Sequence, residues 1–226
     1  MSVSKNLRDT QARIARAAEK SGRTAKDITL VAVTKTIDVE RVREVLACGA
    51  KDLGENKVQE MTAKAAQLEA LGEKPTWHMI GRLQTNKAKA AADTAALIHS
   101  VDSMRLAQEL SRRASTPINF LMQVNVAAED TKAGVDVESA KVFARELQKL
   151  SNMCLRGLMT IAPAVENPEE NRVFFGMMHK VFIDIRNDLD DNNISFLSMG
   201  MTSDFEVAIE EGANIVRVGT GIFGAR

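Results

Sequence analysis

The feature that most constrains this chain is the regular alternation of short apolar runs with longer amphipathic segments. Eight runs are apolar and rich in β-branched residues, as buried strands are, and they cover 29–34, 52–54, 77–81, 97–101, 118–126, 155–161, 195–200 and 215–219. Segments with helical spacing of apolar residues cover 39–46, 58–71, 86–96, 104–114, 137–150, 169–189 and 203–212. This alternation predicts a parallel sheet with right-handed crossovers.

Eight strand–helix units predict an α/β fold of one kind, a single (β/α)₈ TIM barrel formed by residues 1–226 as one domain. The chain has 226 residues, 45% of them hydrophobic, which is enough for a barrel-sized core. The main competitor is an open doubly wound sheet, but no Gly-x-Gly-x-x-Gly turn follows the first strand. An extra N-terminal helix, which ends at Gly22, is expected to close the amino-terminal end of the barrel.

Composition and residue spacing argue against several classes of partner. The 30 basic and 30 acidic residues balance, so nothing favours nucleic acid or an acidic membrane surface. No apolar run approaches the ~20 residues that span a bilayer, and the first residues lack a secretory apolar core. Cys48 and Cys154 have no Cys-x-x-Cys spacing, and the histidines His78, His99 and His179 show no zinc-site spacing. We therefore expect a cytoplasmic protein with reduced cysteines and no metal.

Lys35 is the first candidate functional residue. It follows the first predicted strand directly, at the carboxyl end where α/β barrels place their chemistry. A partly desolvated lysine at that position can lose its proton and form a Schiff base with an aldehyde. The plain alternative is a surface lysine where a strand meets a loop.

The loops after the seventh and eighth strands are where phosphate-binding barrels often hold the phosphate. In the first loop, Ser203 and Glu206 have the spacing of a capping box, which leaves free N–H groups at a helix start. Thr202 and Ser203 add hydroxyl donors there. In the second loop, Gly219 and Thr220 begin a Gly-Thr-Gly turn that lets the backbone approach an anion.

A phosphate and an aldehyde-reactive lysine on one barrel rim indicate either pyridoxal 5′-phosphate (PLP) or a sugar phosphate bound by a lysine aldolase. Arg217 favours the first. Period-two alternation places Arg217 on the same strand face as Ile215 and Gly219, which is the inward face if the glycine lines the site. A permanent positive charge beside a pyridine nitrogen disfavours its protonation and so weakens the ring as an electron sink. An arginine paired to a carboxylate in the barrel wall is the alternative.

Several segments of the sequence, taken together, resemble those of a known family. The chain is similar to the pyridoxal-phosphate homeostasis proteins, whose members resemble the barrel domain of alanine racemase. The matching segments run in order along nearly the whole chain: AVTK (32–35), GENKVQE (54–60), WHMIG (77–81), LQTNK (83–87), LRGLM (155–159), SMGMTSD (198–204) and VRVGT (216–220).

The resemblance implies a role for each matching site residue. Lys35 is expected to form the internal aldimine with PLP, Asn56 to lie near the ring, and Arg217 to face the pyridine nitrogen. The residues expected to hold the phosphate are Thr202, Ser203, Gly219 and Thr220. The family loop commonly reads Gly-Met-Ser, and Thr202 keeps the hydroxyl of that serine, so phosphate binding should be retained. Lys132 aligns with a lysine implicated in cofactor release or a second binding mode, although a solvated loop lysine fits equally well.

The resemblance also implies a PLP carrier in vitamin B6 homeostasis that buffers the cofactor or delivers it to PLP-dependent enzymes, without robust catalysis. Alanine racemase uses a tyrosine from a second domain as its other base, and this chain, with no tyrosine, is expected to lack both. A monomer is expected for the same reason. The histidine nearest in sequence, His78, falls at the wrong end of the barrel, which favours a packed structural role. The alternatives are a small racemase-like PLP enzyme acting on amino acids and a cofactor-free lysine aldolase.

Overall fold

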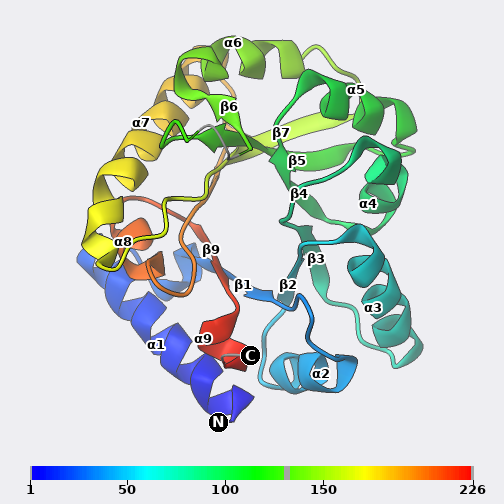
Figure 1. The fold of residues 1–226 in the computed structure, drawn as a ribbon, viewed down its shortest axis with the longest axis vertical. Coiled ribbons are helices and arrows are strands. Elements are labelled where there is room, and N and C mark those ends of the chain that lie inside the picture. Colours follow the sequence, from blue (N-terminus) through cyan, green and yellow to red (C-terminus); the bar gives the residue numbers. More distant parts are fainter. Residues whose placement is uncertain (1, 130–132, 225–226) are drawn as a thin grey trace.

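The strands of the computed structural model close into a parallel barrel. The model describes residues 2–129 and 133–224. The barrel strands are β1 (Thr29–Val33), β2 (Asp52–Glu55), β3 (Thr76–Met79), β4 (Leu97–Val101), β5 (Ile118–Asn125), β7 (Met153–Met159), β8 (Phe196–Ser198) and β9 (Ile215–Val218). They pair in the order β4-β3-β2-β1-β9-β8-β7-β5, and pairing of β4 with β5 closes the ring (Figure 1). The predicted barrel is confirmed, with a two-residue strand β6 (Val135–Asp136) added outside β5.

Helices surround the barrel in Figure 1 and bury the outer face of the sheet. They are α1 (Val3–Lys20), α2 (Val39–Ala47), α3 (Val58–Ala70), α4 (Ala88–Thr94), α5 (Met104–Arg113), α6 (Val137–Leu147), α7 (Arg172–Leu189), α8 (Phe205–Glu210) and α9 (Thr220–Phe223). Short 3₁₀ turns are η1 (Ala25–Asp27), η2 (Thr85–Lys87) and η3 (Pro168–Asn171). Within the described part of the chain, no helix has the length and apolar character needed to cross a membrane.

We expected from the sequence that the N-terminal helix closes the amino-terminal end of the barrel, and this prediction is wrong. Instead, α1 lies along the outside and packs against α8, α9 and α2 (Figure 1). The reason is that, among the described residues, the helix after β9 is the single turn α9, which leaves space in the outer ring of helices. Leu7 and Ala18 of α1 are fully buried in this space, and the Asn6 side chain donates to the Ile222 carbonyl at 2.9 Å.

The interior of the barrel combines a small apolar cluster with buried polar side chains. The inward apolar cluster consists of Val31, Leu97, Leu121, Met159 and Ile215. The outward side chains of the same strands join the larger core beneath the helices. Because both faces of the sheet are buried, the strands appear in the sequence as nearly continuous apolar runs.

Candidate functional site

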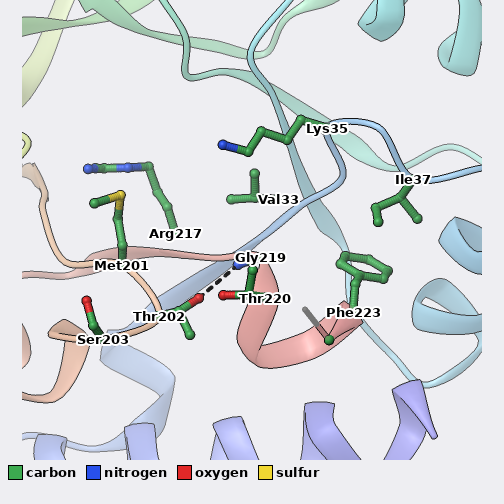
Figure 2. Close-up of a pocket in the computed structure, with 11 residues that line it drawn as sticks. Val33, Lys35, Ile37, Met201, Thr202, Ser203, Arg217, Gly219, Thr220 and Phe223 are labelled. Carbon is green, nitrogen blue, oxygen red and sulfur yellow. Dashed lines mark hydrogen bonds between the residues drawn. The ribbon is translucent and has the colours of Figure 1, made fainter. Parts of the chain in front are cut away.

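A cavity of about 330 Å³ lies at the carboxyl end of β1, β8 and β9 and collects most of the predicted site residues. The predicted residues that line it are Lys35, Thr202, Ser203, Arg217, Gly219 and Thr220 (Figure 2). Val33 forms part of the wall between them. The volume of the cavity is within the range of small-molecule pockets, about 300 to 1,000 Å³.

Lys35 reaches this cavity from the loop that follows β1. Val31 and Val33 point inward, and Lys35, two residues further on, continues the same alternation. Figure 2 shows its side chain extending above Val33 toward Arg217. Lys35 is half-buried, so the sequence-based alternative of a plain surface lysine does not describe its position.

The backbone on both sides of Lys35 is held by side chains of β2 and α3. On one side, Thr34 donates from Oγ1 to Glu55 Oε1 at 2.7 Å, and its carbonyl accepts from Lys64 Nζ at 2.6 Å. On the other side, the Thr36 N–H donates to Glu60 Oε2 at 3.0 Å. Thr36 has a left-handed φ of 62°, which is unfavourable for a β-branched residue and which this contact helps to hold.

Glu55 and Lys64 form a buried ion pair behind the Lys35 loop. Their Oε1 and Nζ atoms are 2.6 Å apart, and the exposed fractions of the side chains are 0% and 10%. Glu60 lies at 3.8 Å from the same ammonium group. The sequence segment GENKVQE therefore supplies both carboxylates around Lys64, those of Glu55 and Glu60. Neither glutamate was assigned a role from the sequence.

Arg217 projects into the barrel from β9, as its alternation with Ile215 predicted. Its guanidinium donates to Ser198 Oγ at 2.6 Å and to the Thr160 carbonyl at 2.9 Å. Burial lowers the pKa of Arg217 to about 10, with a smaller opposing effect of Asp204, so the side chain stays charged at neutral pH. The cavity therefore has a fixed cation in its wall. Among the described residues, no carboxylate forms an ion pair with Arg217, as the alternative interpretation required.

The two predicted anion loops meet at Thr202. Its Oγ1 accepts from the Gly219 N–H at 3.3 Å (Figure 2) and from the Gly221 N–H at 3.3 Å. These N–H groups thus converge on an oxygen atom, as the donors of an anion-binding nest do. A Cβ at Gly221 would lie 3.1 Å from Thr202 Cγ2 in the other loop and 2.8 Å from Val218 Cγ1 at the end of β9, so the glycine suits the close approach of the two loops.

The predicted capping box of Ser203 and Glu206 is wrong. A turn precedes the helix, with the Phe205 N–H donating to the Met201 carbonyl at 2.9 Å, so α8 starts later than expected. The Asp204 carboxylate holds this turn in place of the expected capping box. Its Oδ1 accepts from the Met201 N–H at 2.7 Å, and its Oδ2 accepts from the Asn171 side chain at 2.9 Å. Ser203, whose hydroxyl was expected to donate to a phosphate, still lines the cavity.

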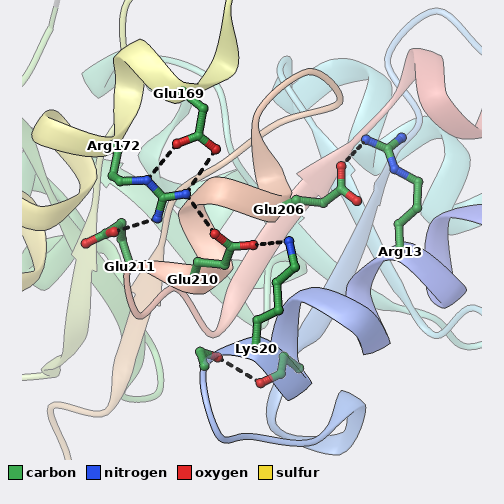
Figure 3. Close-up of polar contacts among 9 residues, drawn as sticks. Arg13, Lys20, Glu169, Arg172, Glu206, Glu210 and Glu211 are labelled. Atoms are coloured by element: carbon green, nitrogen blue, oxygen red, sulfur yellow. Dashed lines mark hydrogen bonds and ion pairs between the residues drawn. The ribbon is translucent and has the colours of Figure 1, made fainter.

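Glu206 belongs to an ionic network on the outside of α8 (Figure 3). It pairs with Arg13 of α1 at 2.6 Å, and Glu210 pairs with Lys20 of the same helix at 2.8 Å. Arg172 of α7 contacts Glu169, Glu210 and Glu211 at 2.7 to 2.8 Å. The helix that follows the anion loop is therefore held to α1 on one side and α7 on the other.

Replacing Arg172 with methionine is expected to lower the free energy of unfolding by about 1 kcal/mol, after allowing for the partial exposure of the network. Three carboxylates lose their shared cation, and their mutual repulsion remains. Urea denaturation at low salt and at about 1 M NaCl measures the effect, which should shrink at high salt because the Debye length falls to about 3 Å. An equal loss at both salt concentrations would contradict an electrostatic origin.

A second cavity of about 410 Å³ adjoins the first and shares Lys35 and Arg217 with it. The remaining predicted residue, Asn56, lines this second cavity. Gly81 lets the next loop approach it, since a Cβ there would lie 2.3 Å from the Asn56 carbonyl oxygen. All predicted site residues thus border one continuous space.

Three polar residues that line the second cavity, Arg82, Gln123 and Asn125, were not predicted from the sequence. Gln123 is buried and donates to the Ala133 carbonyl at 2.8 Å, and Arg82 lies at the exposed side. Gln123 had a detectable signal, since it interrupts the apolar run of β5 with an amide. Lys132, which the sequence also singled out, lies outside the described residues.

His78 is buried near the amino-terminal end of the barrel, as predicted. The sequence spacing gave no sign of a contact between histidines, but His78 Nδ1 lies 2.9 Å from His99 Nε2. The residues are separated in sequence but lie on the adjacent strands β3 and β4. This pairing was not detectable without the strand register.

Comparisons with known proteins agree with this geometry. The family model described as alanine racemase, N-terminal domain, matches residues 6–226. The pyridoxal phosphate homeostasis protein of Aquifex aeolicus is 42% identical over 232 residues, which covers 100% of this chain and 99% of the relative.

Two solved structures extend the comparison. The structure of PipY from Synechococcus elongatus with PLP bound is 32% identical, with a TM-score of 0.85, and the match covers 98% of this chain and 100% of PipY. Alanine racemase from Corynebacterium glutamicum is 15% identical with a TM-score of 0.70, covering 96% of this chain and 60% of the racemase, so it shares the fold alone. The full-length similarity, together with the barrel and its rim cavity, shows that this chain belongs to the pyridoxal phosphate homeostasis protein family, which has the fold of the alanine racemase N-terminal domain.

Proposed function

We propose that this protein binds PLP through Lys35 and holds it for vitamin B6 homeostasis, buffering the cofactor or delivering it to PLP-dependent enzymes. The observation that carries the proposal is that a lysine, a buried arginine and the two loops that meet at Thr202 line one cavity. PipY, a relative with the same fold, binds PLP.

Each group of the site matches one part of the cofactor. When PLP is bound, it supplies an aldehyde that condenses with the Lys35 amine and releases water. Thr202, Ser203, Gly219 and Thr220 would hold the phosphate with hydroxyl and N–H donors. Arg217 would face the pyridine nitrogen, and its fixed charge would disfavour protonation of that nitrogen. Asn56, in the second cavity, would lie beside the ring.

The walls of the two cavities favour a carrier over an enzyme. Among the described residues that line them, only Lys35, Arg82 and Arg217 carry titratable side chains. Racemisation needs a second acid–base group on the opposite face of the substrate from Lys35, and an arginine is a poor proton donor at neutral pH. A racemase-like activity on amino acids is the second candidate, because enzymes share the barrel.

We also propose the circumstances in which the protein works. It acts as one barrel domain over residues 1–226, as a monomer in the cytoplasm, with PLP and its recipient enzymes as partners. Analytical ultracentrifugation of the PLP-loaded protein tests the monomer.

The test of binding is a titration of the purified protein with PLP, followed by visible absorption. We expect a yellow band, and after borohydride reduction a peptide carrying the reduced cofactor on Lys35. Incubation with alanine or serine should give no racemisation at ordinary enzyme rates. A colourless protein that borohydride instead traps with a sugar phosphate would overturn the cofactor assignment and favour the aldolase, and rapid racemisation would favour the enzyme.

A further inference from the structure

A line of hydrogen-bonded polar side chains crosses the interior of the barrel. Arg217 donates to Ser198 Oγ at 2.6 Å, and Ser198 Oγ lies 3.0 Å from His99 Nδ1. His99 Nε2 lies 2.9 Å from His78 Nδ1, and His78 Nε2 lies 3.0 Å from Asp52 Oδ1. Five different strands contribute these side chains, so only the closed barrel brings them together.

The line connects the two ends of the barrel. Arg217, at one end, lines the proposed cofactor cavity. Asp52 and His78, at the other, line a cavity of about 430 Å³ formed largely by the first residues of the strands. Ser198 and His99 between them are 0% exposed, so these contacts are not replaced by water.

The two ends give the line a direction. An arginine can only donate hydrogen bonds and a carboxylate can only accept them. Ser198 therefore accepts from Arg217 and donates to His99 Nδ1. His99 then donates from Nε2 to His78 Nδ1, and His78 donates from Nε2 to Asp52. The opposite arrangement would place the lone pair of His78 Nε2 against the carboxylate.

The charges around His99 support this direction. Burial holds the pKa of His99 well below its ordinary value, and the cation of Arg217 lowers it further. A neutral imidazole has one donor and one acceptor nitrogen, as the directed line requires.

We propose that Ser198, His99 and His78 are positioning residues for Arg217, forming a directed relay whose orientation is set by Asp52 at the far end of the barrel. This rests on the proposed function, in which the PLP ring lies against Arg217. With the carboxylate in place, Ser198 presents only an acceptor to the guanidinium and so fixes its position. If the relay reverses, Ser198 must accept from His99 as well as from Arg217, and its own hydrogen loses its acceptor.

Nitrogen-15 NMR of histidine-labelled protein tests the direction without any cofactor. The chain has three histidines, and His179, on α7, is an internal control. At neutral pH we expect both His78 and His99 to carry their proton on Nε2 with an unprotonated Nδ1. Protons on Nδ1, or a doubly protonated ring, would overturn the relay.

Addition of PLP then tests the coupling. We expect the His99 and His78 signals to shift while the His179 signal stays in place. Asp52→Asn, which can donate to His78 and so permits reversal, should weaken PLP binding about five- to tenfold, equivalent to the net value of one hydrogen bond. Thr76→Val is the matched control, since Thr76 lines the same far cavity outside the relay and should leave the affinity unchanged.

The outcomes separate this proposal from the proposed function. If the wild type binds no PLP, the proposed function fails, and the tautomers alone decide whether the directed line exists. If PLP binds but the histidine signals do not move, or Asp52→Asn binds as tightly as wild type, the relay fails and the binding function stands. Should Asp52→Asn not fold, the tautomers and the PLP-induced shifts of the wild type still give the answer.

Discussion

A Lys35→Ala protein will show no yellow band with PLP, whereas the native protein will, because the covalent bond to the aldehyde requires the Lys35 amine. The loss should be complete, since the cavities that hold Lys35 have no second lysine among their described lining residues. Weak binding through the phosphate loops should remain, because the N–H groups of Gly219 and Gly221 are unaffected.

Visible absorption and borohydride trapping measure this loss. Lys57→Ala is a suitable control, because Lys57 is an exposed lysine near the rim that lines a different cavity. The control protein should retain the band at full intensity. A band of normal intensity in Lys35→Ala would show that another amine carries the cofactor and would remove the basis of the proposed function.

Lys64→Met is expected to lower the free energy of unfolding by about 3 to 5 kcal/mol, which is the typical cost of removing one partner of a buried ion pair and leaving the other unpaired. The Glu55 carboxyl group would lose its cation in a site with 0% exposure, and its Oε2 atom already has no hydrogen-bond partner among the described residues. The Thr34 carbonyl would also lose its donor. PLP binding should weaken as well, because these contacts hold the backbone next to Lys35.

Denaturant unfolding measures this cost, and the double variant Glu55→Gln/Lys64→Met provides the comparison. With the charge of Glu55 removed, the double variant should recover a substantial part of the lost stability. A single variant that loses less than about 1 kcal/mol, or a double variant less stable than the single one, would contradict a buried charge as the cause.

Much of the fold followed from the sequence because its signals are local. Each barrel strand is buried on both faces and so forms an apolar run that can be recognised alone. Period-two alternation placed Arg217 on one strand face with Ile215 and Gly219, and the position of Lys35 after the first strand placed it on the rim. The small residues of the Gly219 loop likewise marked a close backbone approach, which the contact with Thr202 requires.

Other features depended on contacts between segments distant in sequence. The position of α1 is set by the space beside the short helix α9, and the Ser203 capping box fails because Asp204 finds a partner in Asn171.

By itself, the sequence determined the barrel, its rim and the residues that point into the cavity, since these depend on periodicity along one strand or on one loop. Only the tertiary structure decided the pairing of Lys64 with Glu55 and the line from Arg217 to Asp52. The physical reason is that a buried polar group needs a partner, and closure of the parallel sheet determines which side chain from a distant segment supplies it.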